Sequence, residues 1–161
     1  MANRKALIAM DGSEHSEYAF NWYMQNLHRP DDDVMLVFCA EYHSVSQNPV
    51  SLMSGIDPHM LAEMIQQEEK HVAVLLKKFH EMLQEAGVKG QVIRLAGKNP
   101  GEVIVQKAND EDVDFLVTGT RGLGRIRRTF VGSVSDFILH HAHMPVFVCR
   151  HGKLDKHQTG H

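Results

Sequence analysis

The sequence is poor in cysteine and in long hydrophobic runs. Its two cysteines, Cys39 and Cys149, both lie inside apolar segments, which predicts buried thiols in a reducing compartment rather than a disulfide scaffold. The longest apolar run, Val34–Ala40, is far shorter than the roughly 20 residues that a membrane-spanning helix needs. The N-terminus lacks the charged, apolar and small-residue pattern of a secretory signal. We therefore expect a soluble, cytoplasmic protein with no membrane partner.

The chain also lacks a strong excess of charge of either sign. Its formal net charge is −3, so the molecule as a whole is not suited to attract nucleic acid. Hydrophobic residues make up 43% of the 161 residues, which is enough for the chain to bury a core without disulfides. We expect one domain over residues 1–151, a polar tail at residues 152–161 and no nucleic-acid partner.

Several common site patterns are missing. The sequence contains no Gly-Lys-Ser or Gly-Lys-Thr, and therefore no Walker A loop, and it has no Gly-x-Ser-x-Gly nucleophile elbow. His140, His141 and His143 are close together, but no two of them are four residues apart, as a zinc-binding pair on one helix face would be. We therefore predict no metal site and assign no catalytic residue.

Short apolar segments alternate with helical patterns along the chain. Strands are predicted at Lys5–Met10, Val34–Ala40, Gln91–Leu95, Asp114–Thr118 and Pro145–Cys149. The helices between them are predicted to begin near Ser13, Met60, Asn99 and Ser133, and residues 41–57 are predicted to form a loop. The strand segments are mainly apolar and do not alternate, most clearly at Val34–Ala40, which is typical of a parallel sheet covered on both faces. The order of elements therefore predicts an α/β fold with an open, five-stranded parallel sheet.

Two helix starts carry capping signals. Asn99 is expected to cap the helix that begins at Pro100, with Glu102 bonding back to it. Asp11 directly follows the first strand, where it could either contact a ligand or cap the first helix.

The most unusual segment runs from Gly119 to Ser133, with four glycines, four arginines and no acidic residue. Glycine lets a ligand approach the main chain closely, and the N–H groups of a helix that begins at Ser133 favour an anion. If the first and fourth strands are neighbours where the strand order reverses, Asp11 faces the same crevice. The segment is therefore interpreted as a phosphate cradle. Arg121 and Arg125 would either contact phosphate or form a solvated basic rim.

One family shares this arrangement of residues. Gly119-x-x-Gly122, nine further residues and Gly132-Ser133 resemble the G-2x-G-9x-G-(S/T) motif of ATP-binding universal stress proteins. The resemblance covers nearly the whole chain, from Lys5 to Cys149. It implies the strand order 3-2-1-4-5, and it implies ATP or AMP as the ligand, with Mg²⁺ as a candidate companion ion. It also implies a homodimer formed through the strand Val146–Arg150.

The resemblance further implies roles for individual residues. Asp11 would bind the ribose or assist a metal, and the main chain of Cys39 would meet the adenine edge. The ribose and phosphates would be held by Gly119, Gly122, Gly132, Ser133 and Ser135, and Thr118 and Val134 would line the same pocket.

The function that the resemblance implies is a stress-response sensor or regulatory binding module that responds to adenine nucleotide. Two alternatives stay open. One is a slow ATPase or phosphotransfer enzyme that uses the same site, with slow turnover because no residue can be assigned to position an attacking water. The other is an interaction module that binds no nucleotide.

Overall fold

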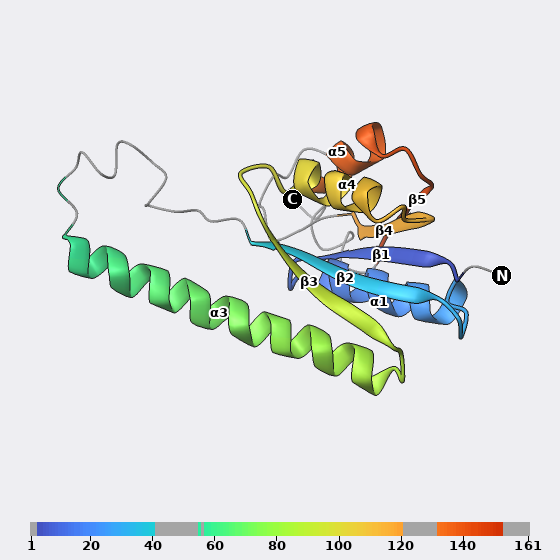
Figure 1. The fold of residues 1–161 in the computed structure, drawn as a ribbon, viewed down its shortest axis with the longest axis horizontal. Coiled ribbons are helices and arrows are strands. Elements are labelled where there is room, and N and C mark those ends of the chain that lie inside the picture. Colours follow the sequence, from blue (N-terminus) through green and yellow to red (C-terminus); the bar gives the residue numbers. More distant parts are fainter. Residues whose placement is uncertain (1–2, 41–54, 56, 121–131, 153–161) are drawn as a thin grey trace.

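The computed structural model of the chain describes residues 3–40, 55, 57–120 and 132–152. Figure 1 shows a twisted sheet with helices on both of its faces. The strands are β1 (Lys5–Met10), β2 (Asp33–Ala40), β3 (Gly90–Ala96), β4 (Phe115–Gly119) and β5 (Val146–Cys149). All pairings are parallel, and the strand order is β3-β2-β1-β4-β5. The predicted fold class and strand order are thereby confirmed.

The helices form one layer on each face of the sheet. They are α1 (Glu14–Asn26), α3 (Pro58–Glu85), α4 (Pro100–Asp110) and α5 (Ser133–His141). One layer, made of α1 and α3, packs on one core cluster, and α4 and α5 pack on the other. Within the described parts of the chain, no helix is both long enough and apolar enough to cross a membrane.

The central strands show why their sequences are apolar without alternation. Ala6, Ile8 and Met10 of β1 join the core under α1 and α3, whereas Leu7 and Ala9 join the core under α4 and α5. Both sets are buried. A strand covered on both faces selects apolar residues at every position.

The register places a switch point between β1 and β4. From Lys5↔Asp33 to Met10↔Phe38, β1 pairs with β2, and from Ala6↔Phe115 to Ile8↔Val117 it pairs with β4. The chain proceeds to one side of the sheet after β1 and to the other side after β4. In open parallel sheets, ligands bind beyond the carboxyl ends of the strands at such a point. The neighbouring position of the first and fourth strands, on which the crevice prediction depended, is confirmed.

Asn99 is the N-cap residue of α4, as predicted, but the predicted capping hydrogen bonds are wrong. The side chain of Asn99 makes no capping hydrogen bond, and its Nδ2 instead donates to Glu102 Oε2 at 3.3 Å. The two side chains thus pair with each other rather than with main-chain N–H groups. Pro100 at the first position still fits the helix start as predicted.

Candidate functional site

The turn that joins β1 to α1 is closed by its own side chains. Ser13 is the N-cap of α1, because its Oγ accepts the N–H of Ser16 at 3.2 Å. Asp11 Oδ1 accepts hydrogen bonds from the Ser13 N–H at 2.8 Å and from Ser13 Oγ at 2.5 Å. Of the two roles left open for Asp11, direct capping is therefore wrong, since Asp11 orients the residue that caps. Its second oxygen, Oδ2, has no partner among the described residues.

The start of α5 differs from this turn. Gly132 is the N-cap of α5, and no side-chain hydrogen bond from the described residues caps this end. The Gly132 N–H donates to the Thr120 carbonyl at 2.5 Å, and the Asp136 N–H donates to the Gly132 carbonyl at 2.8 Å. The first bond ties the residue after β4 to the residue before α5. The first-turn N–H groups of α5, beginning with Ser133, have no acceptor inside the helix.

Two buried hydroxyls connect β4 to α5 from beneath. Ser135 Oγ donates to the Gly119 carbonyl at 2.6 Å and lies 3.2 Å from Thr118 Oγ1. Both residues are buried, whereas Ser133 in the same first turn is exposed. Val134 is half-buried and packs against the core under α4 and α5. The structure therefore brings Thr118, Gly119 and residues 132–135 together, with Ser133 as the exposed hydroxyl.

Gly119 has a packing reason to be glycine. A Cβ at this position would lie 2.7 Å from the main-chain oxygen of His15 and 3.1 Å from the His15 Cβ. The first turn of α1 thus rests directly on the end of β4.

Sequence reasoning missed two buried polar groups beside this contact. Thr120 is fully buried and His15 is nearly so, and among the described residues neither Thr120 Oγ1 nor His15 Nδ1 has a hydrogen-bond partner. Thr120 lies inside the Gly119–Ser133 segment and His15 follows the Asp11–Ser13 turn, but only the packed structure shows that they are buried.

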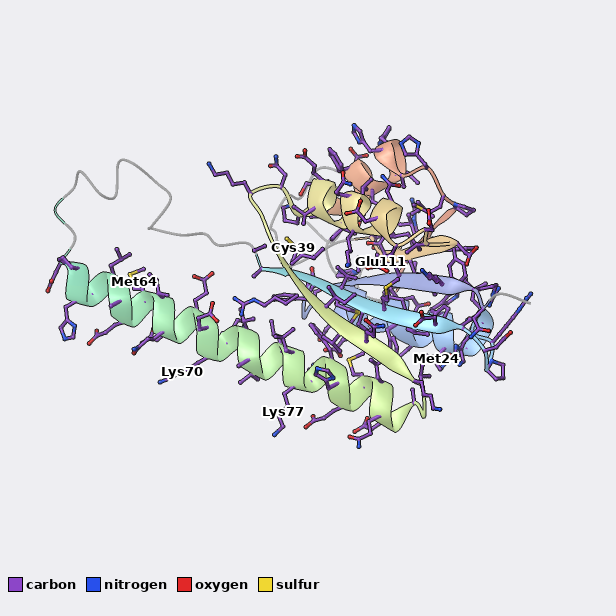
Figure 2. All side chains as sticks on the ribbon, in the orientation of Figure 1. Met24, Cys39, Met64, Lys70, Lys77 and Glu111 are labelled. Carbon is purple, nitrogen blue, oxygen red and sulfur yellow. The ribbon has the colours of Figure 1, made fainter. Side chains whose placement is uncertain are left out.

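Cys39 lies at the carboxyl end of β2 (Figure 2). The pairing of β2 with β1 ends at Phe38, whereas its pairing with β3 continues through Cys39↔Leu95 to Ala40↔Ala96. Over Cys39 and Ala40 the ladder therefore has β3 on one side only, and the other side borders the carboxyl end of β1. A main-chain role of Cys39 in binding stays a prediction.

Both cysteines are buried, as predicted, and they form no disulfide with each other. Burial raises the pKa of the Cys149 thiol to about 11. A thiol with such a pKa is almost entirely protonated at neutral pH and is a poor nucleophile.

Some predicted residues cannot be placed. Gly122, Arg121 and Arg125 lie outside the described residues, as do most of the predicted loop at 41–57 and most of the tail at 152–161. The proposed dimer strand is β5 at the edge of the sheet, and a homodimer stays a prediction.

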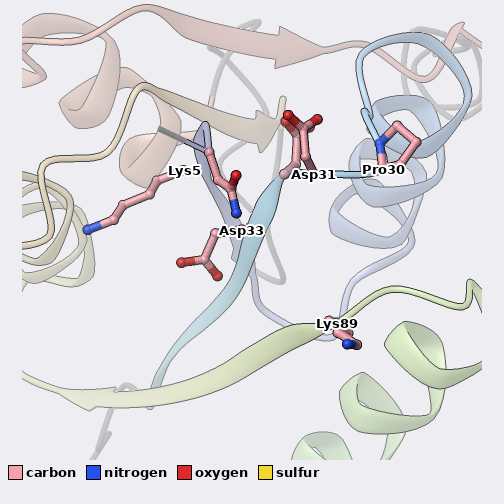
Figure 3. Close-up of a pocket in the computed structure, with 7 residues that line it drawn as sticks. Lys5, Pro30, Asp31, Asp33 and Lys89 are labelled. Atoms are coloured by element: carbon pink, nitrogen blue, oxygen red, sulfur yellow. The ribbon is translucent and has the colours of Figure 1, made fainter. Parts of the chain in front are cut away.

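A surface cavity of about 620 Å³ lies at the amino ends of the strands, and it is lined by Asn3, Lys5, Pro30, Asp31, Asp32, Asp33 and Lys89 (Figure 3). The charges of its walls are mixed. Asp32 is already committed, since its carboxylate accepts from Arg4 Nε and Nη2 at 2.9 Å each, and from the Tyr23 hydroxyl at 2.7 Å. This cavity contains none of the predicted site residues.

The contacts of Asp32 indicate a structural hydrogen-bond network, here called the Asp32 clamp, rather than a reactive group. Burial alone would raise its pKa, but hydrogen bonds from Arg4, from Tyr23 and from the Arg29 N–H outweigh burial and lower the pKa below its ordinary value. The Tyr23 hydroxyl donates its hydrogen bond to Asp32. His28 Nδ1, which lies 3.0 Å from the Tyr23 oxygen, is therefore the donor in the second bond. The network joins the end of α1 to the start of β2.

The described residues include no group of three or more His, Cys, Asp or Glu side chains placed to hold a metal ion. The candidate site is the region beyond the neighbouring carboxyl ends of β1 and β4. It combines an oriented carboxylate on one side with main-chain donors that have no acceptor among the described residues on the other.

Comparisons with known proteins agree with this architecture. The model of the universal stress protein family matches residues 2–150. A Staphylococcus saprophyticus protein that carries the same family name is 32% identical over 148 residues, which cover 91% of this chain and 83% of that protein.

Two solved structures have the same fold. A universal stress protein family member from Arabidopsis thaliana with AMP bound has a TM-score of 0.63 at 22% identity, and the match covers 91% of both chains. A universal stress protein in complex with cAMP also has a TM-score of 0.63, at 16% identity, and the match covers 93% of this chain and 98% of that one.

Proposed function

Because the chain belongs to the universal stress protein family, we propose that it binds an adenine nucleotide, AMP or ATP, between the carboxyl ends of β1 and β4. The observation that carries this proposal is the start of α5, which no side chain of the described residues caps and which the bond between Gly132 and Thr120 holds beside the end of β4. The AMP and cAMP complexes of similarly folded proteins support an adenine nucleotide over other anions.

The phosphate is assigned to the start of α5. The N–H groups of its first turn have no internal acceptor, and the helix dipole favours negative charge there. Ser133 adds an exposed hydroxyl, and Gly132 has no side chain to obstruct the approach. Gly122 and the side chains of Arg121 and Arg125 belong to the proposed cradle on the strength of the motif.

The ribose and the base are assigned to the β1 side. Asp11 Oδ2 is an acceptor with no described partner, and a ribose hydroxyl is a donor that it can bind. If ATP is the ligand, the same carboxylate can assist Mg²⁺. The main chain at Cys39 is assigned to the adenine edge.

Thr118, Gly119 and Ser135 receive supporting roles in this proposal. The hydroxyl of Ser135 donates to the Gly119 carbonyl and so fixes the spacing between β4 and α5. Val134 packs against the core behind them. These contacts fix the donors in place before a ligand arrives, which reduces the ordering cost of binding.

We propose a regulatory module rather than a dedicated enzyme, located in the cytoplasm and working as a homodimer through Val146–Arg150. The edge strand β5 supports this, because an edge presents main-chain groups to a second chain and three of its four residues are only half-buried. Nucleotide occupancy would shift the population of states offered to a partner.

Calorimetric titration with AMP, ADP and ATP tests the proposal. The wild-type protein should bind at least one nucleotide with a Kd of micromolar order, about −8 kcal/mol. Gly132→Val should abolish binding and retain the circular dichroism spectrum of the folded chain. Gly152→Val is the matched control, because a Cβ at that position meets no atom within 4 Å. Absence of binding by the wild-type protein to all three nucleotides would leave the interaction module as the function.

A further inference from the structure

The long helix α3 reaches the candidate site through one side chain. Gly12, in the turn after β1, has a φ of +82°, a conformation that residues with a side chain rarely adopt. A Cβ built on Gly12 would lie 2.7 Å from Leu75 Cδ2, and the three nearest heavy atoms all belong to Leu75. Leu75 therefore occupies the space on the side of the turn where glycine has no side chain.

The same turn carries the carboxylate assigned to the ribose. Asp11 and Ser13, on either side of Gly12, are held by the hydrogen bonds between Asp11 Oδ1 and Ser13. Leu75 adds an apolar contact from a residue more than sixty positions away in the sequence. Because glycine has the largest conformational freedom of any residue, a contact that restricts Gly12 restricts the carboxylate beside it.

A second contact joins α3 to α1 itself. Lys78 Nζ, three residues beyond Leu75, donates to Glu17 Oε1 in the first turn of α1. Both side chains are partly exposed, so this pair contributes little to stability on its own. It does place α3 against the first turn of α1 at a second point.

We propose that Leu75 is a positioning residue for the nucleotide site. It holds the Asp11–Ser13 turn in the form that binds ligand, and it thereby couples the site to the packing of α3. The inference rests on the proposed nucleotide binding. Linkage makes the coupling reciprocal: packing of α3 strengthens ligand binding, and ligand binding strengthens the packing of α3.

The exposed end of α3 gives this coupling a route to the surface. Figure 1 shows the N-terminal part of α3 extending beyond the carboxyl end of the sheet. In this part Met60, Met64 and Ile65 are 59%, 46% and 40% exposed, and Figure 2 shows Met64 near the projecting end. Displacement of α3 at this end would reach Gly12 through Leu75.

Calorimetric titration with AMP of Leu75→Ala and Leu76→Ala tests the proposal. Leu76 is the matched control, because it is the next residue of the same helix, is also half-buried and packs against the same core. If Leu75→Ala leaves about one tenth of the molecules with a competent turn, the apparent Kd rises about tenfold. Leu76→Ala should change the Kd by less than about twofold, within the scatter of uncoupled sites.

Two further readouts separate positioning from a general loss of stability. Leu75→Met, which conserves volume, should restore the wild-type Kd. In hydrogen exchange, AMP should slow the exchange of amides around Leu75 in the wild-type protein. In Leu75→Ala this protection should disappear, while protection at the start of α5 persists.

The outcomes distinguish this inference from the function on which it rests. A wild-type protein that binds none of AMP, ADP and ATP overturns the proposed function. A wild-type protein that binds, together with equal affinities or equal losses in Leu75→Ala and Leu76→Ala, overturns only the role of Leu75. If Leu75→Ala does not fold, Leu75→Val makes the same comparison with a smaller truncation.

Discussion

Two helices begin at the same edge of the sheet, and their starts are built differently. At α1, Ser13 caps the helix and Asp11 fixes Ser13, so side chains satisfy the turn from within. At α5, the cap is Gly132, and no described side chain takes its place. The first start offers an acceptor, Asp11 Oδ2, and the second offers donors. The two helix starts therefore differ in polarity, which suits a ligand with hydroxyl donors at one end and an anion at the other.

The largest expected effect comes from adding a side-chain cap to the start of α5. Gly132→Asp gives α5 a side-chain cap like that of α1, so the helix should gain a few tenths of a kcal/mol. The new carboxylate also takes the donors and repels phosphate, so affinity for AMP should fall by at least about a hundredfold. Titration calorimetry and thermal unfolding measure the two effects. An unchanged Kd would show that the start of α5 does not bind the phosphate.

The reverse change removes the side-chain cap from the start of α1. Ser13→Ala removes the cap of α1 and releases Asp11, so the protein should lose about 1 kcal/mol of unfolding free energy and about tenfold in AMP affinity. Ser133→Ala is its counterpart at α5 and should lower affinity without lowering stability, because Ser133 caps nothing. Urea unfolding and titration of both variants check this. A loss of stability in Ser133→Ala as large as that in Ser13→Ala would contradict the contrast.

The acceptor end can be tested with a changed ligand. Asp11→Asn should weaken AMP about tenfold or more, the cost of a hydrogen bond to a charged group, but should barely change the affinity for an AMP analogue without ribose hydroxyls. Titrations of both ligands against both proteins form the cycle. Equal weakening of the two ligands would move Asp11 away from the ribose.

The smallest expected effect on AMP affinity comes from Asp32, at the amino ends of the strands. Because the pKa of Asp32 is lowered in the folded protein, the stability that it contributes is present above the ordinary carboxyl pKa of about 3.9 and is lost as the pH falls through the folded pKa. Asp32→Asn should be less stable at neutral pH and should lose less stability on acidification, with AMP affinity unchanged. Urea unfolding between neutral and acid pH measures this. The same dependence of unfolding free energy on pH in both proteins would contradict a stabilising role for the Asp32 clamp.

The sequence predicted the parts of the fold that depend on local pattern. The apolar runs at Lys5–Met10 and Val34–Ala40 identified buried parallel strands, and the spacing of Gly119, Gly132 and Ser133 located the loop between strand and helix. The strand order came from the family resemblance. The neighbouring position of β1 and β4 then followed from the same resemblance.

The parts that could not be predicted depend on which distant side chains meet. Nothing in the sequence pairs Leu75 with Gly12, rests His15 on Gly119 or joins Arg4 to Asp32. At Asn99 the local pattern favoured a capping box, but the two side chains satisfied each other instead. Such contacts follow from packing between elements, on which periodicity carries no information.

Amide chemical shifts during titration with AMP test the central claim most directly. Because the phosphate is assigned to main-chain N–H groups, the amides of Ser133 and Val134 should move most, and those of Glu14 and His15 in the capped helix should move much less. Two results would contradict the account: the largest chemical-shift changes at Glu14 and His15, or AMP binding that leaves the amide shifts of Ser133 and Val134 unchanged.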